Sequence, residues 1–142
     1  GTVTWAPTNI TYGHTNRSAQ FRLPQNRYCI ENRAADMTMN VYLALSMTMS
    51  AAVEGIEKKI HPGKPTDQDL YDMSDGDFKK LGIKRLPKNL LMAIEALKND
   101  KLTDEVLGPI MKKSLLAYKN DEWERYHQAV TDWEVKEYLR LY

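Results

Sequence analysis

The segment from Asn40 to about Ile60 limits the possible folds more than any other part of the chain. Asn40 is a favoured N-cap residue, because its side chain accepts hydrogen bonds from the first free amides of a helix. Between Val41 and Val53 nearly every position is apolar, so the predicted helix lacks a broad polar face. Such a helix has to be covered on every side. We therefore expect it at the centre of the core, ended by the His-Pro-Gly sequence at 61–63.

The residues before this helix have the content of strands. Ser18–Leu23 and Tyr28–Arg33 are separated by a Pro-Gln-Asn turn signal, which favours an antiparallel hairpin, and Thr8–Tyr12 is strand-like as well. After the helix, residues 62–86 contain Pro and Gly at short intervals and predict a connector, with a helical turn near Asp69–Met73.

The remainder of the chain has helical patterns. Pro87 is expected at the first position of a helix that reaches about Lys98. The further expectations are a short segment from Thr103 to Leu107, a break at Gly108-Pro109, a long helix from Ile110 to Ala129, and a last helix from Thr131 to about Leu141 with a Thr131-x-x-Glu134 capping box. The predicted fold is α+β and mostly helical, with short antiparallel strands near the N-terminus followed by a bundle of about four to five helices. We assign residues 1–142 to one domain, with a strand and active-site segment at 1–36 and a helical segment at 40–142.

The composition excludes several classes of protein. A content of 42% hydrophobic and 27% charged residues is typical of a globular domain. The net charge of +1 gives no overall electrostatic preference for nucleic acid or a membrane, so neither is expected as a partner. Cys29 is the only cysteine, and residues 1–15 lack a secretory signal, which together favour a reducing cytoplasm.

Four arginines and one acid lie close together near the N-terminus: Arg17, Arg22, Arg27, Arg33 and Glu31. If Tyr28–Arg33 is a strand, Glu31 and Arg33 share one face of it. One interpretation is an ion-pair network on a solvated sheet. The other is a phosphate site, in which guanidinium groups bind phosphoryl oxygens while the carboxylate holds a divalent cation. Such a set suits phosphoryl transfer, which depends on positioning and charge neutralisation.

Short motifs along the chain decide between these interpretations. They are N-R-S-A-Q-F-R-L-P at 16–24, I-E-N-R at 30–33, N-V-Y-L-A at 40–44, A-V-E-G-I and K-K-I within 52–60, L-P at 86–87, E-W-E-R-Y-H at 122–127 and V-T-D-W-E at 130–134. In this order they resemble the glutamine synthetase family, whose corresponding runs include N-R-S/T-x-x-x-R-x-P, x-E-x-R and N-P-Y-L-A. The chain is similar to the C-terminal part of that family's catalytic domain. This ordered resemblance favours the phosphate site.

The resemblance implies a reaction and a role for each residue. The family makes glutamine from glutamate, ammonia and ATP through a γ-glutamyl phosphate, in nitrogen assimilation. By motif match, Glu31 binds Mg²⁺ or Mn²⁺, and Arg33 contacts glutamate and the transferred phosphoryl group. Arg17 stabilises the phosphoryl oxygens and Arg22 holds nucleotide phosphate. The turn between Arg22 and Glu31 is short, so Arg27 is only a candidate for a further nucleotide contact.

Departures from the family pattern leave the amine open. Val41 stands where the family has proline, and Ala34–Met37 replaces its D-P run. The Trp-Ala-Pro sequence at 5–7 and Thr11-Tyr12 look more like the branch that ligates methylamine to glutamate. The connector places Tyr71 where some bacterial members carry an adenylylated tyrosine. His14 and Cys29 are expected to be a loop residue and a strand residue without catalytic roles.

Three hypotheses follow. The first is a fragment of a glutamate–ammonia ligase, active only as part of a longer chain in ring-shaped homo-oligomers, because one carboxylate does not assemble the family's metal cluster. The second keeps this chemistry with methylamine as the amine. The third is a non-catalytic helical interaction module that retains the fold.

Overall fold

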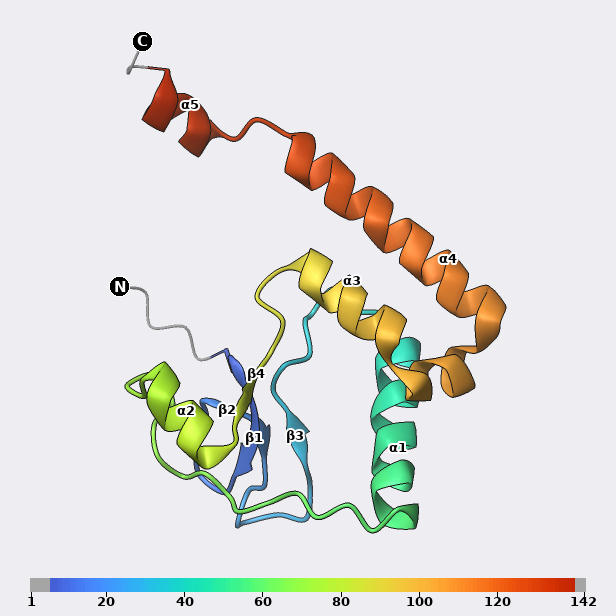
Figure 1. Ribbon diagram of the computed structural model, residues 1–142. Coiled ribbons are helices and arrows are strands. Elements are labelled where there is room, and N and C mark those ends of the chain that lie inside the picture. Colours follow the sequence, from blue (N-terminus) through green and yellow to red (C-terminus); the bar gives the residue numbers. More distant parts are fainter. Residues whose placement is uncertain (1–5, 140–142) are drawn as a thin grey trace. The chain divides into compact units, whose positions relative to one another are not determined.

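The computed structural model describes residues 6–139, which divide into two compact units, one ending at Leu86 and one beginning at Pro87 (Figure 1). The first unit contains a mixed four-stranded sheet of order β3-β2-β1-β4. Its strands are β1 (Asn9–Gly13), β2 (Ala19–Arg22), β3 (Glu31–Asn32) and β4 (Lys84–Arg85).

The strand pairing confirms the predicted hairpin and corrects one part of the topology. β2 and β3 are antiparallel, with Arg22 opposite Glu31. β4, which was not predicted, is antiparallel to β1. β1 and β2, however, are parallel, with Asn9 opposite Ala19 and Gly13 opposite Arg22. The short segment between them has to return the chain to the starting end of β1, and its polar groups bond to the connector instead of to the strands.

The small core of this unit lies between the sheet and a short helix. Ala19, Leu70 and Phe78 are buried together, and Met73 and Ile83 pack against them. Phe78 belongs to α2 (Asp75–Leu81). The expected turn near Asp69–Met73 is present as a single turn, in which Met73 N donates to Leu70 O at 3.5 Å. α2, which was not predicted, begins after Ser74.

α2 has clear end signals. The Ser74 hydroxyl accepts from Asp77 N, the Asp77 carboxylate accepts from Ser74 N, and Gly82 ends the helix at φ 68°. This pair of signals, a capping box followed by a glycine in the left-handed region, was present in the sequence and could have located the helix.

The long apolar helix forms as predicted but is not buried. α1 (Val41–Glu57) is capped by the Asn40 side chain, which accepts from Tyr42 N at 3.1 Å and Leu43 N at 3.2 Å. None of its residues is buried. The expectation that α1 forms the centre of the core is therefore wrong for the described chain, whose buried hydrophobic cluster lies around Ala19, Leu70 and Phe78.

α1 also ends earlier than the predicted stop at 61–63. Lys59 N donates to Ile56 O at 3.2 Å and Ile60 N to Gly55 O at 2.9 Å. Lys59 itself has a φ of 52°. These two bonds around a left-handed residue form a Schellman C-terminus, which terminates the helix before the His-Pro-Gly sequence is reached.

The second unit is helical, with α3 (Leu90–Asn99) packed against α4 (Lys101–Gln128). Asn89 caps α3 through a bond to Met92 N at 2.9 Å, so Pro87 lies outside the helix and not at its first position. Lys112, a residue only 6% exposed, holds the turn between α3 and α4. Its ammonium donates to Asp100 O at 3.0 Å and to Asp104 Oδ1 at 2.7 Å.

The interruption and the last helix of this unit agree with the sequence. Gly108, at φ 66° and ψ 169°, breaks the helical conformation inside α4 and is followed by Pro109. The segment expected from Thr103 begins earlier, at Lys101, because the Asp100 carboxylate caps α4 by accepting from Leu102 N at 2.9 Å. α5 (Asp132–Tyr138) begins with the predicted Thr131–Glu134 capping box. Its predicted end near Leu141 lies outside the described residues.

The mostly helical α+β class is confirmed by these elements. Within residues 6–139, every helix is too short or too polar to traverse a bilayer.

Candidate functional site

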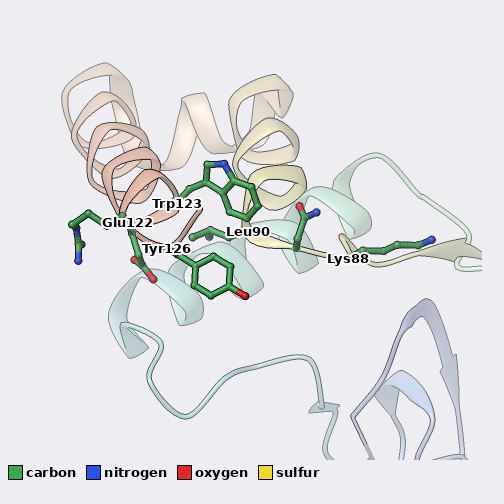
Figure 2. Close-up of a pocket in the computed structure, with 7 residues that line it drawn as sticks. Lys88, Leu90, Glu122, Trp123 and Tyr126 are labelled. Atoms are coloured by element: carbon green, nitrogen blue, oxygen red, sulfur yellow. The ribbon is translucent and has the colours of Figure 1, made fainter. Parts of the chain in front are cut away.

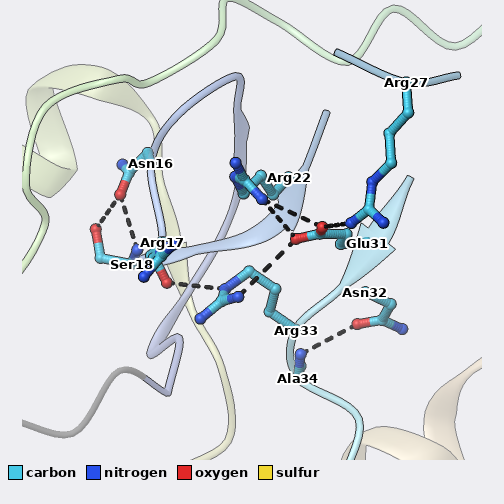
Figure 3. A network of polar contacts seen from close by, with 9 residues as sticks. All are labelled: Asn16, Arg17, Ser18, Arg22, Arg27, Glu31, Asn32, Arg33 and Ala34. Carbon is cyan, nitrogen blue, oxygen red and sulfur yellow. Dashed lines mark hydrogen bonds and ion pairs between the residues drawn. The ribbon is translucent and has the colours of Figure 1, made fainter. Parts of the chain in front are cut away.

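The β2–β3 hairpin brings Glu31 together with three of the four predicted arginines (Figure 3). Arg22 Nη1 donates to both Glu31 carboxylate oxygens, at 3.2 and 3.1 Å. Arg27 donates to Glu31 Oε1 from the turn that precedes β3. Arg33 Nη1 lies 4.0 Å from Glu31 Oε2. All three guanidinium groups therefore point at one carboxylate.

The cluster is partly shielded from solvent. The Glu31, Arg22 and Arg33 side chains are each 23% exposed, and only Arg27, at 61%, extends into solvent. The hydrogen bond from Arg22 lowers the pKa of Glu31 below its ordinary value of 4.5, partial burial opposes this shift, and the Arg27 contact lowers the pKa further. Glu31 is thus kept as a carboxylate, which is the form that binds a cation.

Arg17 joins the cluster through its backbone. Arg33 Nε donates to the Arg17 carbonyl oxygen at 3.0 Å. The Arg17 residue is exposed, and in the part of the chain that the structure describes its guanidinium forms no ion pair with Glu31. Arg17 lies in the loop before β2, so the alternation of faces along a strand does not fix its direction.

The charge balance of this site favours an anion ligand. Four guanidinium groups surround or adjoin a single carboxylate, so the region keeps an excess of positive charge after Glu31 is paired. A network that served only to neutralise a sheet face would need more acids. Phosphoryl oxygens complement such a set, because planar guanidinium groups bind them in a bidentate manner.

A metal site is not complete within the described residues. Glu31 is a suitable hard oxygen ligand, but residues 6–139 contain no group of three or more His, Cys, Asp or Glu side chains that could hold a metal ion. Mg²⁺ requires near-octahedral oxygen coordination. The chain therefore offers one carboxylate ligand, and no full coordination sphere is built from these residues alone.

Three other singled-out residues lie outside the cluster. His14 N donates to Asp67 Oδ1 at 2.6 Å, and its Nδ1 lies 3.2 Å from Asp67 Oδ2, which fits the predicted loop role. Cys29 is exposed and precedes β3. The Tyr71 hydroxyl donates to Ala6 O at 2.7 Å, and burial raises the pKa of Tyr71.

The sequence motif around Arg17 also contains two residues to which no role was assigned. Asn16 and Ser18 are only 6% and 2% exposed. The Asn16 side-chain oxygen accepts from the Ser18 amide and hydroxyl, and Figure 3 draws these bonds beside Arg17. The signal in the sequence that could have identified them is a short polar residue on each side of a predicted functional arginine.

The second unit has a hollow of its own, of about 630 Å³ (Figure 2). Trp123 and Tyr126 of α4 and Leu90 at the start of α3 line it, with Lys88 and Arg125 among the polar lining residues. None of its lining residues belongs to the Glu31 cluster.

Comparison with known proteins agrees with the motifs. Residues 2–138 match the family model described as "Glutamine synthetase, catalytic domain". A glutamate–methylamine ligase from Methyloversatilis universalis is 39% identical over 140 residues, covering 99% of this chain and 31% of that protein. A glutamine synthetase from Methanococcus maripaludis is 36% identical over 139 residues, covering 96% of this chain and 31% of that protein.

A solved structure gives the same result for the fold. The structure described as "Apo GmaS without ligand" superposes with a TM-score of 0.79 at 32% identity, covering 94% of this chain and 30% of that one. The chain thus spans about a third of the length of the relatives that it matches.

Proposed function

The chain belongs to the glutamine synthetase family, as the C-terminal part of its catalytic domain, and we propose that it supplies the phosphate-binding half of an ATP-dependent glutamate–amine ligase site. The observation that carries this proposal is the convergence of Arg22, Arg27 and Arg33 on the Glu31 carboxylate. The similarity of the chain to glutamine synthetases and to a glutamate–methylamine ligase supports the class of reaction.

In the proposed reaction, a glutamate γ-carboxylate oxygen attacks the γ-phosphorus of ATP, and ADP leaves with the electrons of the broken bond. The amine then attacks the acyl carbon of the γ-glutamyl phosphate, inorganic phosphate leaves, and the amine loses a proton. Both steps develop negative charge on phosphoryl oxygens, so positioned cations accelerate them. In this proposal Arg17 and Arg33 neutralise that charge, Arg22 holds nucleotide phosphate, and Arg27 adds a nucleotide contact from the exposed turn.

Glu31 has a second proposed role as a ligand of Mg²⁺ or Mn²⁺. A bound divalent cation would neutralise phosphate charge in this site. Glu31 is ionised and lies among the arginines, which fits one ligand of such an ion. The other ligands would come from sequence outside these residues, since residues 6–139 hold no group of three or more His, Cys, Asp or Glu side chains that could bind a metal ion.

The proposal extends to the state of the protein. We expect homo-oligomers in which other parts of the full-length protein complete each site, in the cytoplasm, with ATP, glutamate and the amine as the ligands. The 142-residue polypeptide by itself is then expected to be inactive. Phosphate release by this polypeptide that depends on glutamate, ATP and an amine would contradict the expectation.

The leading amine is ammonia, and the alternative is methylamine. The 39% identity to a glutamate–methylamine ligase supports methylamine as the alternative amine. Trp5, in the motif that resembles that branch, lies outside the described residues. Turnover of the full-length protein with ammonia and with methylamine at matched concentrations decides between them.

The test of the proposal compares two carboxylates in the full-length protein. Glu31→Gln removes the one negative charge among the arginines, whereas Glu95→Gln removes the negative charge of a surface ion pair with Lys98 at 3.7 Å. ATP-dependent amide formation is expected to fall by roughly a hundredfold or more in Glu31→Gln and to stay near the wild-type rate in Glu95→Gln. A full-length protein without activity toward either amine would instead favour a non-catalytic interaction module.

A further inference from the structure

Two stretches that are distant in the sequence run against each other in the first unit. Thr66 N donates to Tyr12 O at 2.8 Å, and the Thr11 and Thr66 hydroxyl oxygens are 3.1 Å apart. The Tyr12 hydroxyl donates to Gly63 O at 3.1 Å. The connector after α1 is therefore tied to the end of β1 and to the loop that leads to Arg17.

The contact is close at Gly13. A Cβ atom at this position would lie 2.5 Å from Thr66 O and 2.9 Å from Asp67 Oδ1. A backbone oxygen at that distance leaves no space for a methyl group. Glycine thus lets β1 and the connector approach closely enough for the next residues of the loop to be bonded.

The side-chain amide of Asn16 uses all of its hydrogen-bonding groups, with the connector on one side and Ser18 on the other. Nδ2 donates to Thr66 O at 2.8 Å and to Gln68 O at 2.7 Å. Oδ1 accepts from Ser18 N at 2.8 Å and from the Ser18 hydroxyl at 2.5 Å. With two donors and two acceptor positions used, the buried amide is saturated.

Ser18 extends the same network on the other side of Arg17. Its hydroxyl oxygen accepts from Leu70 N at 3.0 Å, and the residue is 2% exposed. The backbone of Arg17 is therefore held by the buried residues before and after it, and its carbonyl oxygen is held by Arg33 Nε at 3.0 Å. Only the Arg17 side chain extends outward.

We propose that Asn16 is a positioning residue, which fixes the Arg17 backbone against the connector so that the guanidinium is aimed before the substrate binds. This inference rests on the proposed role of Arg17 at a phosphoryl group. Preorganisation matters at such a site, because a displacement of about 1 Å can cost on the order of a hundredfold in rate. The connector between α1 and α2 thereby becomes a support of the site.

The test is a double-mutant cycle in the full-length protein, with kcat and the KM for ATP measured for Arg17→Ala, Asn16→Ala and the double variant. We expect Asn16→Ala to lower kcat by roughly 10- to 100-fold with little change in KM, and Arg17→Ala to lower it further. The double variant should be no slower than Arg17→Ala alone, since Asn16 has nothing to position once the guanidinium is absent.

A matched control separates positioning from a general loosening of the connector. Thr11→Val removes the hydroxyl contact with Thr66 but leaves the bonds of Asn16 and Ser18, so its kcat should stay within about twofold of wild type. If Asn16→Ala does not fold, as judged by circular dichroism, Ser18→Ala replaces it in the cycle. That variant loses only the hydroxyl bonds, and we expect a smaller loss of kcat with the same lack of additivity.

The outcomes distinguish a failure of the proposed role of Arg17 from a failure of the positioning role of Asn16. If Arg17→Ala keeps the wild-type kcat, the proposed role of Arg17 fails, and the positioning inference fails with it. If Arg17→Ala is slow but the losses multiply in the double variant, or Thr11→Val loses as much as Asn16→Ala, the positioning inference alone is overturned.

Discussion

At the scale of single residues, Arg33 connects the parts of the site. It lies 4.0 Å from the Glu31 carboxylate and donates to the carbonyl of Arg17. The sequence could place Glu31 and Arg33 on one face, because they are two residues apart in a segment with the content of a strand. It could not place Arg22, whose position depends on the register between β2 and β3, or Arg17, which lies outside the strand.

Arg33→Ala in the full-length protein should reduce kcat for amide formation by roughly a hundred- to a thousandfold, because it removes both a transition-state cation and the bond to Arg17. Arg33→Lys keeps the charge but loses the planar fork, so it should recover only part of the rate. Steady-state assays with saturating ATP measure this. A near-normal rate for Arg33→Ala would argue against the assigned site.

The ionisation of Glu31 gives a second prediction. Because its folded-state pKa lies below the ordinary 4.5, the ionised Glu31 stabilises the fold above about that pH, and this stabilisation is lost as the pH falls through the lowered pKa. In Arg22→Ala the Glu31 pKa should rise toward 4.5, since the bond from Arg22 is the main cause of the shift. Carboxyl ¹³C NMR titration measures it.

Glu134 is the internal control for this titration. Its pKa is lowered by the hydrogen bonds from Thr131 in the α5 capping box, which Arg22 does not touch. A Glu31 pKa that does not move in Arg22→Ala, or a Glu134 pKa that moves with it, would contradict the local origin of the shift.

At the scale of elements, local signals were sufficient where they were complete. The start of α1 was predicted from Asn40, and the break in α4 from Gly108-Pro109. The start of α5 was predicted from the Thr131–Glu134 capping box. The pairing of β1 with β2 in parallel was not predictable, because it depends on the connector that holds the returning loop. The end of α1 was missed because Lys59, and not a glycine, takes the left-handed conformation.

The left-handed conformation of Lys59 leads to a prediction for the free energy of unfolding. A non-glycine residue in the left-handed region costs about 1–2 kcal/mol, part of which is offset because glycine gains freedom in the unfolded chain. Lys59→Gly should therefore stabilise the polypeptide by about 0.5–1 kcal/mol in urea unfolding. Lys59→Ala keeps the Cβ atom and should gain little. An equal gain in both variants would mean that charge, and not backbone conformation, is the cause.

At the scale of the whole molecule, α1 shows what sequence alone could not decide. Its apolar pattern predicted a helix, which forms, and a buried position, which the described chain does not show, since none of its residues is buried. The large apolar residues of α1 that are more than half exposed are Val41, Tyr42, Leu45, Met49, Val53 and Ile56. Since the matched relatives are about three times longer, we infer that cover comes from sequence outside this chain.

This inference predicts opposite effects of one substitution in two contexts. In the 142-residue polypeptide the exposed apolar face of α1 should drive self-association, and Met49→Lys, at a side chain 59% exposed, should weaken it. In the full-length protein the same lysine would be buried and should lower the melting temperature, because an unpaired charge is costly away from water. Ala51→Lys, at an exposed position on the opposite side of the same helix, is the matched control and should weaken self-association less. Sedimentation velocity and thermal unfolding measure the two effects, and a monomeric wild-type polypeptide would show that α1 is soluble without cover.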